Sequence, residues 1–203
     1  MKYKMYFGMD FVKNQFDYSD SETLNKKLSE FKEWCDSGNG AKKIFQIYSE
    51  ELEPECIREV CDIIEKMFPN TLYMGCSTSG NIIDCQLSGR ITIVCTVFEL
   101  PSTQVQLYQY DLSKQSVDDI TKTIVKETES NPWVKAMEMF FTIPEQSSTQ
   151  FCEGLKNVRQ DIQIFGGVAC SDDITSDASC VFSKAAGFSE KSIIVMFYGG
   201  DDF

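Results

Sequence analysis

The chain has 203 residues, of which 42% are hydrophobic and 25% charged, a balance typical of a folded globular protein rather than a disordered one. Its formal net charge of -12 argues against nucleic acid and anionic membrane as partners, because such a surface repels phosphate groups. The sequence contains neither an apolar stretch of transmembrane length nor the apolar core of a signal peptide.

Histidine is absent, which excludes Ser-His-Asp and Cys-His catalysis and metal sites built on histidine. The nine cysteines are odd in number and none forms a Cys-x-x-Cys pair. This usage is typical of reduced, buried cysteines and not of a disulfide framework or a zinc site. We therefore expect a cytoplasmic protein with no metal and no other cofactor.

The first part of the chain alternates strands and helices. Loose alternation over 3–11 predicts a strand, and a capping-box pattern at Ser19 and Glu22 begins a helix that Gly38 can close. The pattern then predicts a strand, a helix and a strand over 43–49, 54–68 and 71–75.

The second part begins with three strand-like runs joined by short turns, over 81–87, 90–99 and 103–111. Ser113 is positioned to cap a third helix, and alternating apolar residues from Met137 to Ile143 predict another strand. Ser147 is positioned to cap a fourth helix. Strands over 162–166, 179–183 and 191–198 complete the chain.

These elements predict an α/β fold with four main helices and a mixed, largely antiparallel sheet of about nine strands. Two packed sheets between helices are the alternative. Residues 43–99 and 138–199 share the order strand, helix, strand, Gly-rich loop and strand pair, which indicates a diverged internal repeat. No linker interrupts the chain, so we expect a single domain over 1–203.

Two segments rich in glycine, residues 75–80 and 166–173, follow predicted strands and form the candidate functional site; they are called the Gly-rich segments below. Backbone N–H groups beside glycines can form a nest for a carboxylate, and hydroxyls and carboxylates nearby can bind the rest of a small zwitterion. The structural alternative is two polar turns whose serines bond to their own backbone. The candidate ligand-binding residues are Gly75, Cys76, Ser77, Thr78, Ser79, Gly80, Gly166, Gly167, Ala169, Asp172 and Asp173.

A nucleophilic role for Cys76 or Ser77 lacks a base, because the chain has no histidine and no lysine lies close in sequence to either segment. We therefore expect no enzymatic activity. A thiol-based redox sensor that uses Cys76 and Cys170 stays open as an alternative, since the repeat can bring these residues together. A protein-interaction scaffold with no small ligand is the other alternative.

Three segments of the chain resemble the N-terminal domain of the FIST family, whose name stands for F-box and intracellular signal transduction. They are Phe-Pro-Asn-Thr-Leu-Tyr-Met-Gly-Cys-Ser-Thr-Ser-Gly-Asn over 68–81, Gly-Gly-Val-Ala-Cys-Ser-Asp over 166–172 and Ile-Ile-Val-Met-Phe-Tyr-Gly over 193–199. The family's loops run close to Gly-Cys-Ser-Thr-Ala-Gly-Glu and Gly-Gly-x-Ala-x-Asp. Ser79 and Asn81 depart from the first of these patterns.

The resemblance implies a sensory domain of a bacterial signalling protein, joined to or acting on a downstream output domain or partner protein. Such domains have been proposed to bind small ligands such as amino acids. The family usually carries a second FIST domain after this one, so the chain is either a short form or a fragment of a longer protein. We expect a cytoplasmic input domain that binds an amino acid or similar small polar metabolite between the two Gly-rich segments.

Overall fold

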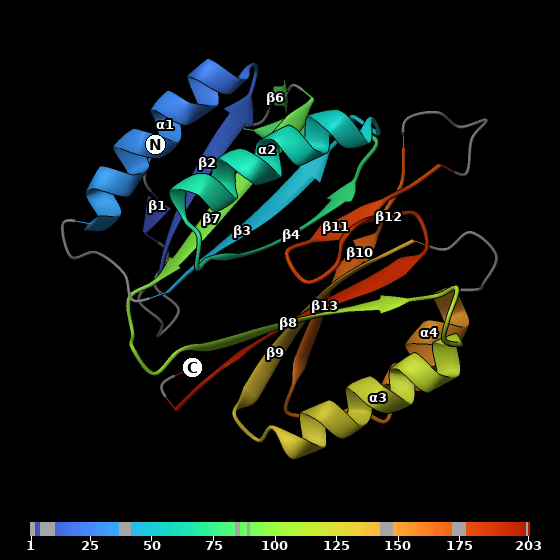
Figure 1. Cartoon of the computed structure of the whole chain (residues 1–203). Coiled ribbons are helices and arrows are strands. Elements are labelled where there is room, and N and C mark those ends of the chain that lie inside the picture. The colour runs from blue at the N-terminus through green and yellow to red at the C-terminus, as the bar shows by residue number, and fades with distance from the viewer. Residues whose placement is uncertain are drawn as a thin grey trace.

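The computed structural model describes residues 3–4, 11–36, 42–83, 86–88, 90–142, 148–171, 178–201 and 203, and has four layers (Figure 1). Two helices cover the outer face of one mixed sheet, two more cover the outer face of a second mixed sheet, and the inner faces of the sheets pack together. The predicted α/β class with four helices is confirmed, in the form of two packed sheets between helices. None of the described helices is long and apolar enough to cross a membrane.

The larger sheet contains seven strands and is covered by α1 (Ser21–Asp36) and α2 (Pro54–Met67). Strands β3 and β4 are parallel, and the other pairings in this sheet are antiparallel. In spatial order the strands are β1 (Tyr3–Lys4), β2 (Phe11–Tyr18), β7 (Ile91–Phe98), β3 (Lys42–Ser49), β4 (Leu72–Ser77), β11 (Val181–Ser183) and β12 (Gly187–Ser189).

The smaller sheet contains four strands and is covered by α3 (Val117–Ser130) and α4 (Ser148–Leu155). Its β10 and β9 are parallel, and its other pairings are antiparallel. In spatial order the strands are β10 (Gln163–Val168), β9 (Val134–Phe141), β13 (Ser192–Gly199) and β8 (Gln104–Asp111). A separate hairpin is formed by β5 (Asn81–Ile83) and β6 (Gln86–Ser88).

The internal repeat is confirmed by the topology and begins earlier than the sequence predicted. The run β2-α1-β3-α2-β4-β5-β6-β7 matches the run β8-α3-β9-α4-β10-β11-β12-β13 element by element. Each run contributes four strands to its sheet in the same order, β2-β7-β3-β4 and β8-β13-β9-β10. Because hairpin β11–β12 pairs with β4, the second half of the chain also extends the sheet of the first half.

Four local predictions need correction. The α1 helix is capped by Asp20 rather than Ser19, because the Asp20 side chain accepts the N–H of Thr23 at 2.7 Å. The structure has thirteen described strands rather than about nine, because several are only two or three residues long. The first long strand occupies Phe11–Tyr18, beyond the predicted 3–11, since it pairs along its whole length with β7. The α3 helix is capped by Ser116 rather than Ser113, because the Ser116 side chain accepts the N–H of Asp119.

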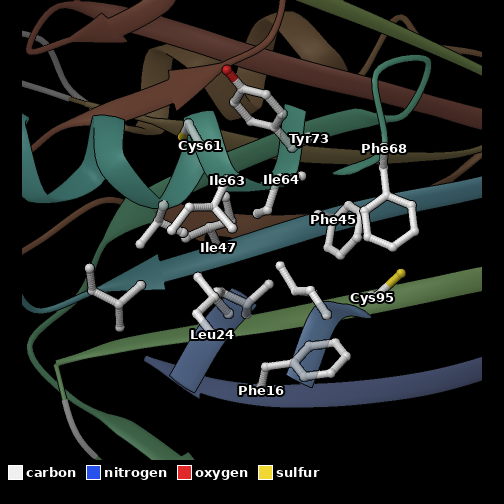
Figure 2. Packing of buried hydrophobic residues seen from close by; sticks show 14 of the residues in the cluster. Phe16, Leu24, Phe45, Ile47, Cys61, Ile63, Ile64, Phe68, Tyr73 and Cys95 are labelled. Atoms are coloured by element: carbon white, nitrogen blue, oxygen red, sulfur yellow. The ribbon is translucent and has the colours of Figure 1, made fainter. Parts of the chain in front are cut away.

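The core between α1, α2 and the larger sheet is rich in aromatic side chains (Figure 2). Leu24 and Leu28 are fully buried on the face of α1 that the helical spacing predicts. The ring centroids of Phe16 and Phe31 lie 5.5 Å apart, and those of Phe45 and Phe68 lie 5.3 Å apart. This packing fixes β3 and β4, which lead into the first Gly-rich segment.

A second core lies between the sheets and buries the inner faces of both. Ile44 and Met74 from the larger sheet pack in one cluster with Phe140, Ile194 and Met196 from the smaller sheet. Every residue of β13 is buried, because helices cover one face of its sheet and the other sheet covers the other. Strands buried on both faces become continuous apolar runs, so a polar residue within one is informative.

Candidate functional site

The two Gly-rich segments, more than ninety residues apart, meet where β4 and β10 end. The backbone N–H of Cys170 donates to the carbonyl oxygen of Ser77 at 3.2 Å. The Ser79 hydroxyl and the Cys170 thiol are 3.4 Å apart and both are exposed. The ends of two strands from different sheets are therefore joined at one place on the surface.

The first three candidate residues lie inside strand β4 and not in a loop. A Cβ on Gly75 would lie 2.4 Å from the Phe182 ring, so glycine is required there for packing. Cys76 and Ser77 are buried. Ser77 exchanges two bonds with Cys180: its N–H donates to the Cys180 carbonyl oxygen at 2.8 Å, and its Oγ accepts the Cys180 N–H at 3.0 Å.

The next three candidates form a turn at the surface. The Thr78 N–H donates to the Ser49 carbonyl oxygen at 2.8 Å, and the Gly80 N–H donates to Thr78 Oγ1 at 3.3 Å. Thr78 Oγ1 in turn donates to the Gly80 carbonyl oxygen at 2.9 Å. These backbone donors already have partners within the protein, so the exposed Ser79 hydroxyl is the group of this turn best placed to contact a ligand.

The second segment is also mostly strand. Gly166 has φ +133°, and a Cβ there would lie 1.9 Å from the Met139 carbonyl oxygen. Gly167 has open space where its Cβ would be. Ala169 is buried and its N–H donates to the Phe141 carbonyl oxygen at 2.9 Å. Asp172 and Asp173 lie outside the described residues.

The Cys76 thiol has its pKa raised by burial, with smaller contributions from the nearby Cys180 and Cys170 thiols and from Glu138. A thiol must lose its proton to act as a nucleophile, and burial opposes this step. The environment of Cys76 is therefore that of an unreactive core cysteine.

A cleft between the two sheets is the feature that the sequence analysis missed. It has a volume of about 530 Å³, and most of the surface that faces it is apolar. Its lining residues come from six strands and the segments beside them: Lys13, Ile44, Gln46, Thr96, Phe98, Lys135, Ala136, Glu138, Asp161, Gln163, Phe165, Tyr198 and Phe203.

Glu138 is the buried acid of this cleft, with only 4% of its surface exposed. Its Oε2 accepts hydrogen bonds from Gln46 Nε2 at 3.0 Å and from the Tyr198 hydroxyl. Burial raises the pKa of the Glu138 carboxyl, while the bonds from Tyr198 and Gln46 and the charge of Lys13 act in the opposite direction. The carboxyl is thus placed where its ionised form is poorly solvated.

A sequence signal for the cleft was present. Glu138 lies between Met137 and Met139 in a strand that is otherwise apolar from Ala136 to Phe141. An acid in such a run is buried at a cost, so it requires partners or a function. The partners themselves could not be found from the sequence, because Gln46 and Tyr198 are 92 and 60 residues away along the chain.

Comparison with known families gives one result for most of the chain. The model of the FIST N domain family matches residues 45–203, from the middle of β3 to the last residue. The match therefore includes both Gly-rich segments and most of the cleft. A comparison with curated proteins found no match.

Proposed function

Because the chain belongs to the FIST N domain family, a family of sensory domains in signal transduction, we propose that it binds a small polar metabolite at the junction of its two Gly-rich segments. The proposed ligand is an amino acid or a molecule of similar size and polarity. The observation that supports this site is the contact of Ser77 and Ser79 with Cys170, which brings the two segments to one exposed surface.

The proposed contacts are made by side chains rather than by a backbone nest. The N–H groups of Ser77, Thr78, Gly80, Ala169 and Cys170 all donate within the protein. The Ser79 hydroxyl and the Cys170 thiol are exposed and can turn toward a ligand. A ligand that contacts both would bridge the two sheets, since Ser79 follows β4 and Cys170 follows β10.

Signalling in this proposal is non-enzymatic and takes place in the bacterial cytoplasm. A ligand can bias a downstream domain or partner protein only if it binds two conformations of the input domain with different affinities. The junction is a suitable place for such a difference, because a small change in the spacing of β4 and β10 there would be transmitted to both sheets.

The experiment is a thermal-shift screen of the purified protein against amino acids and small carboxylates. A ligand at about 100 times its Kd should stabilise the protein by roughly 2.7 kcal/mol, which is a shift of a few degrees. The shift should be reduced in Ser79→Ala and kept in Ser130→Ala, an exposed serine at the end of α3. A flat screen with a folded protein would favour the interaction scaffold.

The redox-sensor alternative requires a disulfide between Cys76 and Cys170. Cys170 is exposed, whereas Cys76 is buried and burial raises the pKa of its thiol. The Cys76 thiol is therefore poorly suited to form a disulfide with Cys170. Mass spectrometry after mild peroxide treatment tests the alternative directly. A Cys76–Cys170 disulfide in the folded protein would replace the metabolite proposal with a thiol-based one.

A further inference from the structure

The inter-sheet cleft is separate from the junction of the Gly-rich segments. Gln163 and Phe165, in the first half of β10, line the cleft, whereas Cys170 lies two residues beyond the end of that strand. The volume of about 530 Å³ is within the range of small-molecule sites, and such sites are mostly apolar with a few converging polar groups. The cleft has both properties.

The aromatic side chains that line the cleft favour a ligand with an apolar group. The Phe98 and Tyr198 ring centroids are 6.2 Å apart, and the Phe165 and Tyr198 rings are stacked with centroids 6.3 Å apart. Phe165 is 49% exposed, so part of this wall is open to solvent. An apolar group of about the size of a phenyl ring would cover that exposed surface.

The hydrogen bonds of Glu138 in the cleft do not require its negative charge. Glu138 Oε2 accepts bonds from two neutral donors, the Gln46 amide and the Tyr198 hydroxyl, and Gln46 in turn accepts a bond from Thr96 at 3.4 Å. A neutral glutamine at position 138 could accept the same two bonds. The negative charge of Glu138 is therefore available for something other than holding the sheets together.

We infer that the cleft binds a small organic ammonium ion with an apolar body, with the ammonium on Glu138 and the body against Phe98 and Phe165. A cation supplies the charge that a buried carboxylate lacks. An organic anion would be repelled by the Glu138 carboxylate, and a purely apolar molecule would leave that carboxylate with only its two neutral donors, Gln46 and Tyr198. The net charge of -12 also favours approach of a cation over an anion.

Two lysines and one further acid lie around the same cleft. Lys13 on β2 and Lys135 on β9 add positive charge, and Asp161 adds negative charge but pairs with Arg159 at 3.1 Å. Lys13 acts electrostatically on Glu138 and so competes with an incoming ammonium. The ligand also makes apolar contacts with Phe98 and Phe165, and these contacts favour the ligand over Lys13 in the competition for Glu138.

The test uses two probes with the same body and opposite charge, phenethylamine and 3-phenylpropionate, in calorimetric titrations of the intact protein. Phenethylamine should bind saturably and 3-phenylpropionate at least tenfold more weakly. Glu138→Gln should weaken phenethylamine binding at least tenfold. The control is Glu127→Gln, which changes a half-buried glutamate that also accepts a bond from a tyrosine, Tyr108, at 3.1 Å.

Phe165→Ala provides a second variant that does not depend on the buried pair, because Phe165 is at the exposed edge of the smaller sheet. It should also weaken phenethylamine binding. Circular dichroism and thermal unfolding identify any variant that fails to fold. Unchanged binding in folded Glu138→Gln, equal binding of the two probes, or no saturable phenethylamine binding by the folded wild type would each overturn the inference. The result for phenethylamine does not depend on the junction of the Gly-rich segments, because that site is tested separately with polar ligands and the Ser79→Ala variant.

Discussion

Gln46 Nε2 donates to Glu138 Oε2 at 3.0 Å, and this buried hydrogen bond joins the two sheets at equivalent positions of the internal repeat. Gln46 is the fifth residue of the eight in β3, and Glu138 is the fifth of the eight in β9. Each faces the third residue of its parallel neighbour, Met74 in β4 and Phe165 in β10. The polar pair therefore lies near the axis that relates the two halves.

Replacement of Glu138 by glutamine should remove a pH dependence of stability. Burial raises the folded pKa above the ordinary 4.5, so between the unfolded and folded pKa values the native state holds a proton that the unfolded state has released. The stabilising contribution is full below the unfolded pKa and is lost as pH rises through the folded pKa. Urea unfolding from pH 4.5 upward should show wild type losing stability relative to Glu138→Gln.

The tyrosine and cysteine side chains that interact with Glu138 do not change charge between the unfolded and folded pKa values of Glu138. Burial raises the pKa of Tyr48, Cys76 and Tyr198, so all three stay neutral across this range of pH. Parallel pH profiles for wild type and Glu138→Gln would show that the Glu138 carboxyl titrates normally in the folded protein.

Gly166→Ala should destabilise the protein far more than Gly167→Ala. Gly166 has a positive φ, and its added Cβ would meet the Met139 carbonyl oxygen on the parallel neighbouring strand, whereas the Cβ at Gly167 would meet open space. Strained backbone of this kind costs about 1–3 kcal/mol, and the steric contact adds to it. Urea denaturation of the two variants checks this, with Gly167→Ala expected within about 0.5 kcal/mol of wild type. Equal losses would mean that the glycine pair does not have this geometry.

Ser77→Ala should cost about 1–3 kcal/mol of unfolding free energy. It removes the Oγ that accepts the buried Cys180 N–H at 3.0 Å and leaves that donor without its partner. Ser79→Ala, two residues later at an exposed position, should change stability by less than about 0.5 kcal/mol. Thermal and urea unfolding of both variants distinguish the structural serine from the surface serine, and a reversed order would contradict the assignment.

Iodoacetamide should label the cysteines in the order of their exposure. Cys152 and Cys170 are exposed and should react first. Burial raises the pKa of Cys61 to about 12 and that of Cys180 to about 11, so few of these thiols ionise near neutral pH. Time-resolved mass spectrometry of the labelled protein reports each rate. Rapid labelling of Cys76 would show an activated thiol and would revive the catalytic and redox hypotheses.

The helices, most strands and the repeat could be predicted from the sequence because each depends on local patterns. Leu24, Leu28, Phe31 and Cys35 recur at helical spacing, and all are buried on one face of α1. Local signals also predicted Gly-rich segments at the ends of two strands, which correspond to β4 and β10. Chain order alone then suggested that equivalent segments lie together.

Tertiary structure decided which of those residues are buried. Gly75, Cys76 and Ser77 belong to β4 because β11, more than a hundred residues later, pairs with that strand and covers its edge. The register of β3 with β4 and of β9 with β10 makes Gly75 equivalent to Gly166, each being the fourth residue of its strand. Pairing between distant strands sets such a register, and no local pattern encodes it.

The sequence by itself determined the α/β class, the repeated order of elements and the two Gly-rich segments, since propensity and hydrophobic period act over a few residues. Only the tertiary structure decided that there are two sheets and that Gln46, Glu138 and Tyr198 meet in a cleft between them. The physical reason is that a buried carboxylate depends on groups brought near it by packing, and these come from three strands far apart in the chain.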